Sequence, residues 1–86
     1  MDINNLIAIV KKKLQDNIVI EKIDIEDKSF LHKNHSGHQK GKYHFKLTIH
    51  SVELKKLNRI ESDKKIYKVL HQEIKEYIHS LQILIN

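Results

Sequence analysis

The segment from Tyr43 to His50 reads Y-H-F-K-L-T-I-H and alternates apolar and polar residues more regularly than any other part of the chain. A period of two is the pattern of a β-strand that buries one face and exposes the other. The apolar face holds Tyr43, Phe45, Leu47 and Ile49. The polar face holds His44, Lys46, Thr48 and His50. We therefore predict a strand over residues 43–50 that packs on a core, with His44 on its solvent-facing side.

Two further apolar patterns precede this strand. Residues 3–14 repeat apolar side chains at helical spacing, and either Asp2 or Asn4 can cap the start of that helix. The spaced residues are Ile3, Leu6, Ile7, Val10 and Leu14. Residues 18–27 are rich in β-branched side chains and predict a strand, with an irregularity where the alternation slips between Ile20 and Ile23.

The second half of the chain predicts one long helix between two shorter elements. Residues 51–61 are polar and basic, which is typical of a short helical turn or connection. Ser62 or Asp63 is expected to cap a long helix whose apolar stripe runs to Ile78. His79 would end this helix, where an imidazolium suits the helix dipole. The chain closes with L-Q-I-L-I, a short strand.

The order of these elements predicts an α+β fold, a two-layer αββαβ sandwich formed by a single domain over residues 1–86. The first two strands should pair antiparallel, and the last strand, which follows a helical crossover, should lie parallel to the second. The result is a three-stranded mixed sheet with both helices on one face. A chain of 86 residues buries only a thin core.

The charge of the chain favours acidic partners. Lysine and arginine number 16 against 11 acidic residues, a net charge of +5. The basic residues near the predicted long helix are Lys55, Lys56, Arg59, Lys64, Lys65 and Lys68. A docking face for an acidic protein, or a solvated surface, is favoured over a nucleic-acid interface. Tyr67 is the only aromatic residue among these charges, so there is no aromatic interleaving to support base stacking, and G-H-Q-K-G lacks the GXXG spacing of a KH loop.

Composition also excludes several classes of function. The chain has no cysteine, so it can supply no thiolate ligand, and this fits a reducing compartment such as the cytoplasm or the interior of a mitochondrion. No apolar run approaches the ~20 residues that span a bilayer, so no membrane association is expected. No arrangement of nucleophile, base and acid is apparent, so we expect a protein that is not an enzyme.

A histidine-rich segment lies between the two central strands, over residues 29–41, and reads S-F-L-H-K-N-H-S-G-H-Q-K-G. Its histidines, His32, His35 and His38, recur every three residues. Imidazole binds zinc, iron, copper and nickel. The segment is therefore either a metal-binding loop or a polar loop that binds metal only adventitiously.

Several motifs together resemble the BolA family over residues 20–85. They are I-E-D-K-S-F-L-H-K-N-H, Y-H-F-K-L-T-I-H-S, I-Y-K-V-L-H-Q-E-I and I-H-S-L-Q-I. The family fold is similar to class II KH domains. The resemblance implies an adaptor that pairs with a monothiol glutaredoxin and glutathione in iron–sulfur cluster assembly, cluster trafficking and iron homeostasis. Such an adaptor would bind no cofactor alone and would share a 2Fe–2S cluster with its partner. The alternative that the resemblance implies is a nucleic-acid-binding regulator of transcription, stress response or morphology.

The resemblance also implies a set of cluster ligands. The family pattern expects a histidine within R-H-R at the start of the long helix, and Asp63 stands at that place. A carboxylate is a harder ligand than imidazole and suits a cluster less well. His32 and His35 align with the family loop that carries the second ligand in some members. Ligation by His32 or His35, or weakly by Asp63, is therefore expected beside a docking face around residues 63–68.

Overall fold

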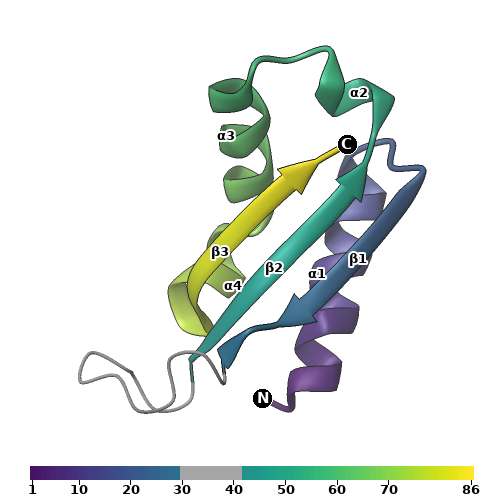
Figure 1. Ribbon diagram of the computed structural model, residues 1–86. Helices are drawn as coiled ribbons and strands as arrows, with labels where there is room; N and C mark the ends of the chain where they lie inside the picture. Colours follow the sequence, from purple (N-terminus) through teal and green to yellow (C-terminus); the bar gives the residue numbers. More distant parts are fainter. Residues whose placement is uncertain (30–41) are drawn as a thin grey trace.

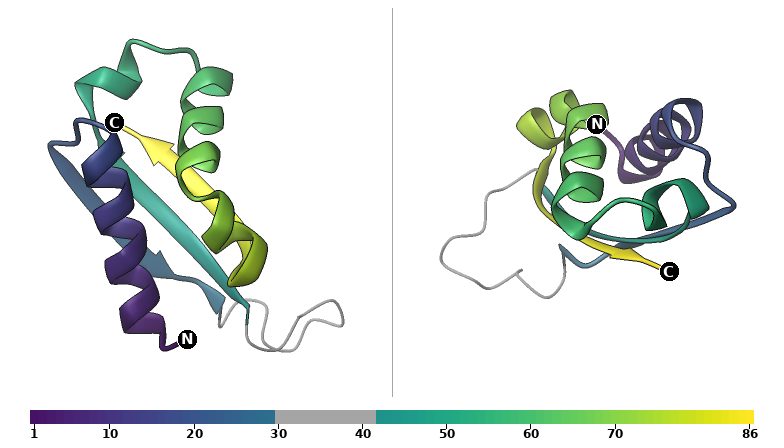
Figure 2. Two further views of the ribbon diagram at one scale, coloured as in Figure 1. Left: turned by 180° about the vertical axis from the view of Figure 1, so that it is seen from behind. Right: turned by 90° about the horizontal axis from the view of Figure 1, so that it is seen from above.

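The computed structural model describes residues 1–29 and 42–86 as a three-stranded sheet with helices on one face (Figure 1). The elements along the chain are α1 (Ile3–Asn17), β1 (Lys22–Asp27), β2 (Tyr43–His50), α2 (Val52–Lys55), α3 (Arg59–Val69), α4 (His71–Glu76) and β3 (Ile78–Ile85). The view from above shows every helix on the same side of the sheet (Figure 2). The predicted α+β fold with a mixed three-stranded sheet is confirmed.

Strand β2 lies in the middle of the sheet and pairs with both neighbours. β1 runs antiparallel to it, with Ile23 opposite Ile49. β3 runs parallel to it, with Ile83 opposite Leu47. These are the directions that the sequence predicts. The predicted irregularity before Ile23 falls outside the ladder, because β1 begins only at Lys22.

The core lies between the helix-facing side of the sheet and the helices. Phe45, Leu47 and Ile49 of β2 are buried, as the alternation predicts. The helices add Leu6, Val10, Leu14, Leu54, Ile66 and Leu70. Burying each such side chain stabilises the fold by about 1.5–3 kcal/mol. None of the described helices has the length and apolar character needed to cross a membrane.

The starts of the two main helices differ in how well the sequence predicts them. Asp2 caps α1, since its carboxylate accepts the Asn4 N–H at 2.9 Å, and this choice was one of the two predicted. The cap of α3 is Asn58 and not Ser62 or Asp63, so that prediction is wrong. Asn58 and Glu61 form a reciprocal capping box, with bonds of 2.8 and 3.3 Å. Ser62 is buried, and its hydroxyl donates to the Arg59 carbonyl.

The predicted long helix is two helices followed directly by a strand. α3 ends at Val69, and the following residue, Leu70, has a φ of −98° and a ψ of 15° that turn the chain into α4. β3 then begins at Ile78, so the prediction that His79 ends a helix is wrong. The reason is tertiary, because Ile78 is buried in the core and pairs with Tyr43 of the central strand. That long-range pairing outweighs the helical spacing of the apolar residues.

A partly buried ion pair joins the first and last helices. Lys13 of α1 donates to Glu73 of α4 at 2.5 Å, and the Glu73 side chain is only 8% exposed. A buried carboxylate is costly unless a charged partner compensates it. Lys13 is therefore needed to keep α4 against α1.

Replacing Lys13 by methionine should destabilise the protein, because it leaves the Glu73 carboxylate buried without its cation. We expect a loss of about 1–3 kcal/mol in the free energy of unfolding, measured by urea titration. The double variant Lys13→Met/Glu73→Gln should lose less than the single variant. Lys12→Met is the matched control, since it breaks an exposed ion pair with Asp16. A control loss as large as that of Lys13→Met would contradict the prediction.

The capping box of α3 gives a second test. Asn58→Ala removes the side chain that accepts the Glu61 N–H, and we expect a loss of about 1 kcal/mol in the free energy of unfolding. Asp63→Ala removes only the contact with Arg59 one turn away and should cost about 0.3 kcal/mol. Urea unfolding of both variants compares them directly. A larger loss in Asp63→Ala would show that the helix depends on the carboxylate that the sequence favoured.

Candidate functional site

His44 lies at the start of the central strand and is buried, with 4% of its surface exposed. Its N–H donates to the Ser29 hydroxyl at 3.1 Å, and its carbonyl accepts the Lys28 N–H at 2.7 Å. Its ring also contacts residues of β3. The prediction that His44 is a solvent-facing surface histidine is therefore wrong, because neighbouring segments cover the polar side of β2 at this end.

The pairing of β2 with β3 contains one extra residue at this end of the sheet. Tyr43 is opposite Ile78, and His44 is opposite Ser80, so His79 has no counterpart on β2. Such a bulge changes the side to which the following residues point. Ile78 is buried against the helices, whereas His79 and Ser80 both contact His44. The bulge thus places His79 on the side of the sheet that lies away from the helices.

The starts of β2 and β3 lie side by side (Figure 1), and three side chains meet there. The rings of His44 and His79 meet edge to face, with centroids 5.0 Å apart and planes inclined by 64°. His44 Nδ1 and the Ser80 hydroxyl are hydrogen-bonded at 2.6 Å. His79 is exposed, so its imidazole is the one that an external group can reach. We refer to His44, His79 and Ser80 as the histidine pair site.

The donor chemistry of the histidine pair site suits a soft or borderline metal. Imidazole is a good ligand for iron and zinc, and a buried neighbour that orients the ligand ring is usual at such sites. Two imidazoles supply at most two ligands. Within residues 1–29 and 42–86, no cluster of three or more histidine or acidic residues is arranged to hold a metal ion.

The predicted loop ligands His32, His35 and His38 lie outside the described residues. Ser29, the last described residue before them, accepts the His44 N–H. Ser29 and Lys42, the described residues on either side of these histidines, therefore both lie near the histidine pair site, since Lys42 directly precedes β2. Ligation by these histidines stays a prediction.

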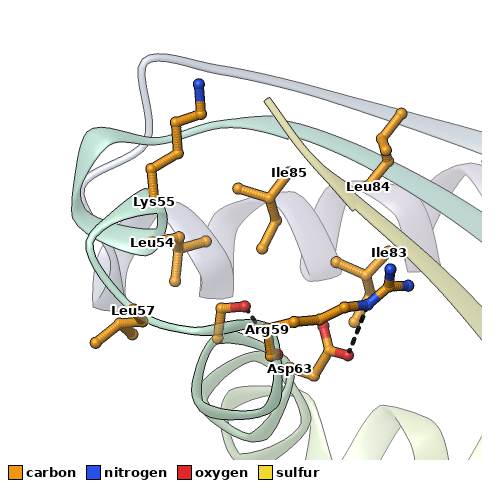
Figure 3. A pocket seen from close by; sticks show the side chains of 9 residues that line it. Leu54, Lys55, Leu57, Arg59, Asp63, Ile83, Leu84 and Ile85 are labelled. Carbon is orange, nitrogen blue, oxygen red and sulfur yellow. Dashed lines mark hydrogen bonds and ion pairs between the residues drawn. The ribbon is translucent and has the colours of Figure 1, made fainter.

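Asp63, the other predicted ligand, lies at the opposite end of β3. It lines a pocket of about 260 Å³ between α2, α3 and the last residues of β3 (Figure 3). Its carboxylate is 3.9 Å from Arg59 Nε. At ~3.3 Å per residue along β3, the strand residues that line this pocket are about 13–20 Å from His79. The structure does not bring Asp63 together with the histidine pair site.

The predicted docking residues lie on two neighbouring helices, α2 and α3. Lys55 and Lys56 lie at the end of α2, and the remaining members, Arg59, Lys64, Lys65 and Lys68, lie on α3. Lys65 pairs with Glu53 at 3.0 Å, whereas Lys56, Lys64 and Lys68 are exposed. We call these six residues the basic face.

His79 is the site residue to which the sequence assigned another role. The spacing of the apolar residues indicates that His79 belongs to a bulged strand. Ile78 and Leu81 both pack on the core although they are three residues apart. A regular strand would place them on opposite faces. An extra residue between them is what allows both to face inward.

Comparisons with known proteins agree with this architecture. The family model for BolA-like proteins matches residues 14–86. A relative from Haemophilus influenzae, named DNA-binding transcriptional regulator BolA, is 29% identical over 75 residues, which cover 87% of this chain and 70% of the relative.

Solved structures show the same fold. The BolA domain of SufE1 from Arabidopsis thaliana has a TM-score of 0.76 and 26% identity, with coverage of 92% of this chain and 87% of that one. BolA1 from Arabidopsis thaliana has a TM-score of 0.76 and 24% identity, with coverage of 93% and 88%. Since the family model spans all but the first 13 residues, the chain belongs to the BolA-like protein family.

Proposed function

We propose that this protein is a non-catalytic adaptor that pairs with a monothiol glutaredoxin and glutathione in the assembly or transfer of a 2Fe–2S cluster. The observation that carries the proposal is the bulge in β3, which exposes the His79 imidazole and seats it against His44. His79 is the ligand that this chain would offer. The cluster is cargo that the two proteins would share.

The chemistry of the histidine pair site supports this assignment. Histidine replaces cysteine at one iron of Rieske-type clusters, so an imidazole is a competent terminal ligand for a 2Fe–2S centre. The chain has no cysteine, and the thiolates would come from glutaredoxin and glutathione. His44 and Ser80 would act as positioning residues, because their hydrogen bond fixes the ring on which His79 rests. A preset imidazole could replace one glutathione thiolate on the cluster without moving the sheet.

A second ligand from this chain is the prediction for His32 or His35. The described residues support it only through Ser29, which anchors the chain beside His44. A carboxylate from Asp63 fits the proposal less well, since Asp63 lies beyond the other end of β3 and faces Arg59. The proposal therefore assigns ligation to the histidine end of the sheet.

The basic face would dock the same partner. Because His79 lies on the side of the sheet away from the helices, a partner that contacts both His79 and the basic face must reach around the outer edge of β3 (Figure 2). An interface of about 800 Å² on each protein is large enough to include both places. Charge attraction would orient an acidic partner before the ligand exchange takes place.

The deciding experiment mixes the protein with a cluster-loaded monothiol glutaredoxin and follows visible circular dichroism. We expect the wild-type protein to change the cluster spectrum and His79→Ala to abolish that change. The apparent affinity for the loaded partner should fall at least about tenfold, because a ligand to the cluster is lost. His71→Ala is the matched control, since His71 is an exposed histidine on α4, which lies on the helix side of the sheet (Figure 2), whereas His79 lies on the other side.

Further variants locate the second ligand. The double variant His32→Ala/His35→Ala should weaken the spectral change if the loop supplies a ligand, whereas Asp63→Ala should preserve it. A spectrum that survives in His79→Ala but is lost in Asp63→Ala would contradict the assignment to the histidine pair site. NMR titration with apo and loaded partner completes the test. Unchanged amide shifts throughout the protein would refute the pairing itself.

A second candidate function is that of a nucleic-acid-binding regulator. Two observations favour it, namely the name of the Haemophilus influenzae relative and the basic face on α2 and α3. Tyr67 is the one aromatic residue of α3 and lies between Lys65 and Lys68, and a single ring is a poor platform for successive bases.

Salt dependence separates the two candidates. We expect labelled duplex DNA and single-stranded RNA to bind weakly at low salt and to dissociate at physiological salt, because surface charge attraction alone is screened. A regulator that contacts about six phosphates would lose about a thousandfold in affinity between 50 and 200 mM salt yet still bind its specific site. Submicromolar binding of one sequence at physiological salt, lost in Lys64→Gln/Lys68→Gln, would favour the regulator.

A further inference from the structure

The outer edge of β3 pairs with no other strand of the described residues. β3 ends the sheet order β1-β2-β3, so β2 covers only one of its sides. The Asn86 N–H donates to the Ile49 carbonyl at 2.8 Å, which directs the backbone groups of even-numbered residues here toward β2. Ile83 and Ile85, one residue out of phase, direct their N–H and C=O groups outward. The Tyr67 hydroxyl bonds to the outward carbonyl of Leu81 and limits the open edge to residues 82–85.

The composition of this edge is unusual. Edge strands normally carry charged residues or proline, which discourage other strands from pairing with them. β1, at the opposite edge, reads K-I-D-I-E-D and follows that rule. β3 reads I-H-S-L-Q-I-L-I, with no lysine, arginine, acidic residue or proline. Its last residues therefore form an edge with no charge to oppose strand addition.

The pocket of about 260 Å³ lies along this open edge (Figure 3). Ile83 and Ile85 face the helices, whereas Leu84 lies on the opposite side of the strand, yet all three line the pocket. The pocket therefore reaches around the edge of the strand. Leu54 and Leu57 add apolar lining, and its size suits one or two side chains better than a drug-sized molecule, which needs about 300–1,000 Å³.

The rim of the pocket is basic. Lys55 and Arg59 both line it, and both are exposed. Arg59 has one acidic neighbour, Asp63, but the contact is long at 3.9 Å and the Arg59 side chain is 84% exposed. A surface pair of this length contributes little, so the guanidinium can engage another carboxylate.

We infer that this edge binds an extended, acidic segment of a partner protein by strand addition. Its backbone pairs with the outward groups of Ile83 and Ile85, one large apolar side chain enters the pocket, and flanking carboxylates contact Lys55 and Arg59. The inference deepens the proposed function, because Lys55 and Arg59 belong to the basic face to which that function assigns docking. It names the chemistry that a partner must present there.

Two other occupants fit the surface less well. A second copy of the chain could pair its own β3 with this edge, but that strand has no acidic residue to place against Lys55 and Arg59. A single-stranded nucleic acid needs aromatic platforms for its bases, and the residues that line the pocket are aliphatic, polar or charged. The uncharged strand edge and its basic rim together match an acidic peptide.

The test uses the purified protein alone and an end-capped, fluorescein-labelled peptide, Glu-Val-Glu-Leu-Glu-Val-Glu. We expect saturable binding by fluorescence anisotropy, with the largest amide shift changes at Ile83 and Ile85. The same peptide with every backbone nitrogen methylated keeps its charge and apolar side chains but cannot donate strand hydrogen bonds. It should bind about tenfold more weakly or worse. A version with lysine in place of glutamate should not bind.

Variants of the protein assign the contacts. Lys55→Gln/Arg59→Gln should lower the affinity about five- to tenfold, because two carboxylate contacts are lost. Lys11→Gln/Lys22→Gln removes the same amount of charge from exposed positions on α1 and β1. This control should change the affinity for the peptide by less than about twofold. Ile85→Pro removes an outward N–H only and should abolish binding with the fold retained, as checked by far-UV circular dichroism. Ile85→Val is its control and should still bind.

Several outcomes would overturn the inference. Equal affinities for the methylated and parent peptides, or equal losses in the two charge variants, would reduce binding to general charge attraction. Concentration-dependent dimerisation abolished by Ile85→Pro would assign the edge to a second copy. Displacement of the peptide by single-stranded DNA at a lower concentration would assign the pocket to nucleic acid. A lack of binding at millimolar peptide would refute strand addition outright. Since neither glutaredoxin nor a cluster is present, this result is independent of the cluster experiment.

Discussion

The hydrogen-bonded pairing of β2 with both neighbouring strands is the interaction on which the rest of the structure depends. Side chains alternate along a strand, so the register of a neighbour decides which of its residues enter the core. With Ile23 opposite Ile49 and Ile83 opposite Leu47, both outer strands turn apolar residues toward the helices. α1 and α3 can then pack on one continuous apolar surface. A shift of either ladder by one residue would bury polar side chains beneath the helices.

The single irregularity in these ladders gives β3 two chemically different ends. At its start, the extra residue lets Ile78 stay in the core and turns His79 toward His44. At the end of β3, the pairing with β2 is regular, and the backbone N–H and C=O groups of Ile83 and Ile85 point outward beside the pocket. One strand therefore carries an imidazole at one end and an open edge at the other. The rigid sheet keeps the distance between them fixed.

Features that depend on local pattern could be predicted from the sequence. The alternation of residues 43–50 located the central strand, and the apolar spacing after Asp2 located α1. The start of α3 could also have been found, because Asn58 and Glu61 have the spacing of a capping box. Ser62 and Asp63, the predicted caps, lie within the first turns of α3.

Features that depend on contacts between distant residues could not be predicted. The helical spacing of Ile74 and Ile78 continues the stripe of α3, and only the pairing with Tyr43 assigns Ile78 to a strand. Lys13 and Glu73 are 60 positions apart, and no local pattern connects them. The histidine pair site has the same origin, because the neighbours that bury His44 belong to other segments of the chain. The predicted roles of His32, His35 and His38 concern residues outside the described ranges.

The bulge in β3 has a consequence for how such proteins can diverge. The ladder is regular from Phe45 and Leu81 onward, and the residue before the bulge is already fixed in the core. Losing one residue between Ile78 and Leu81 would straighten the strand without disturbing the pairing on either side. The side chains that meet His44 would then be reduced from two to one. A deletion of a single codon could thus remove this pair of imidazoles from a lineage and leave its fold intact, and an insertion could restore it.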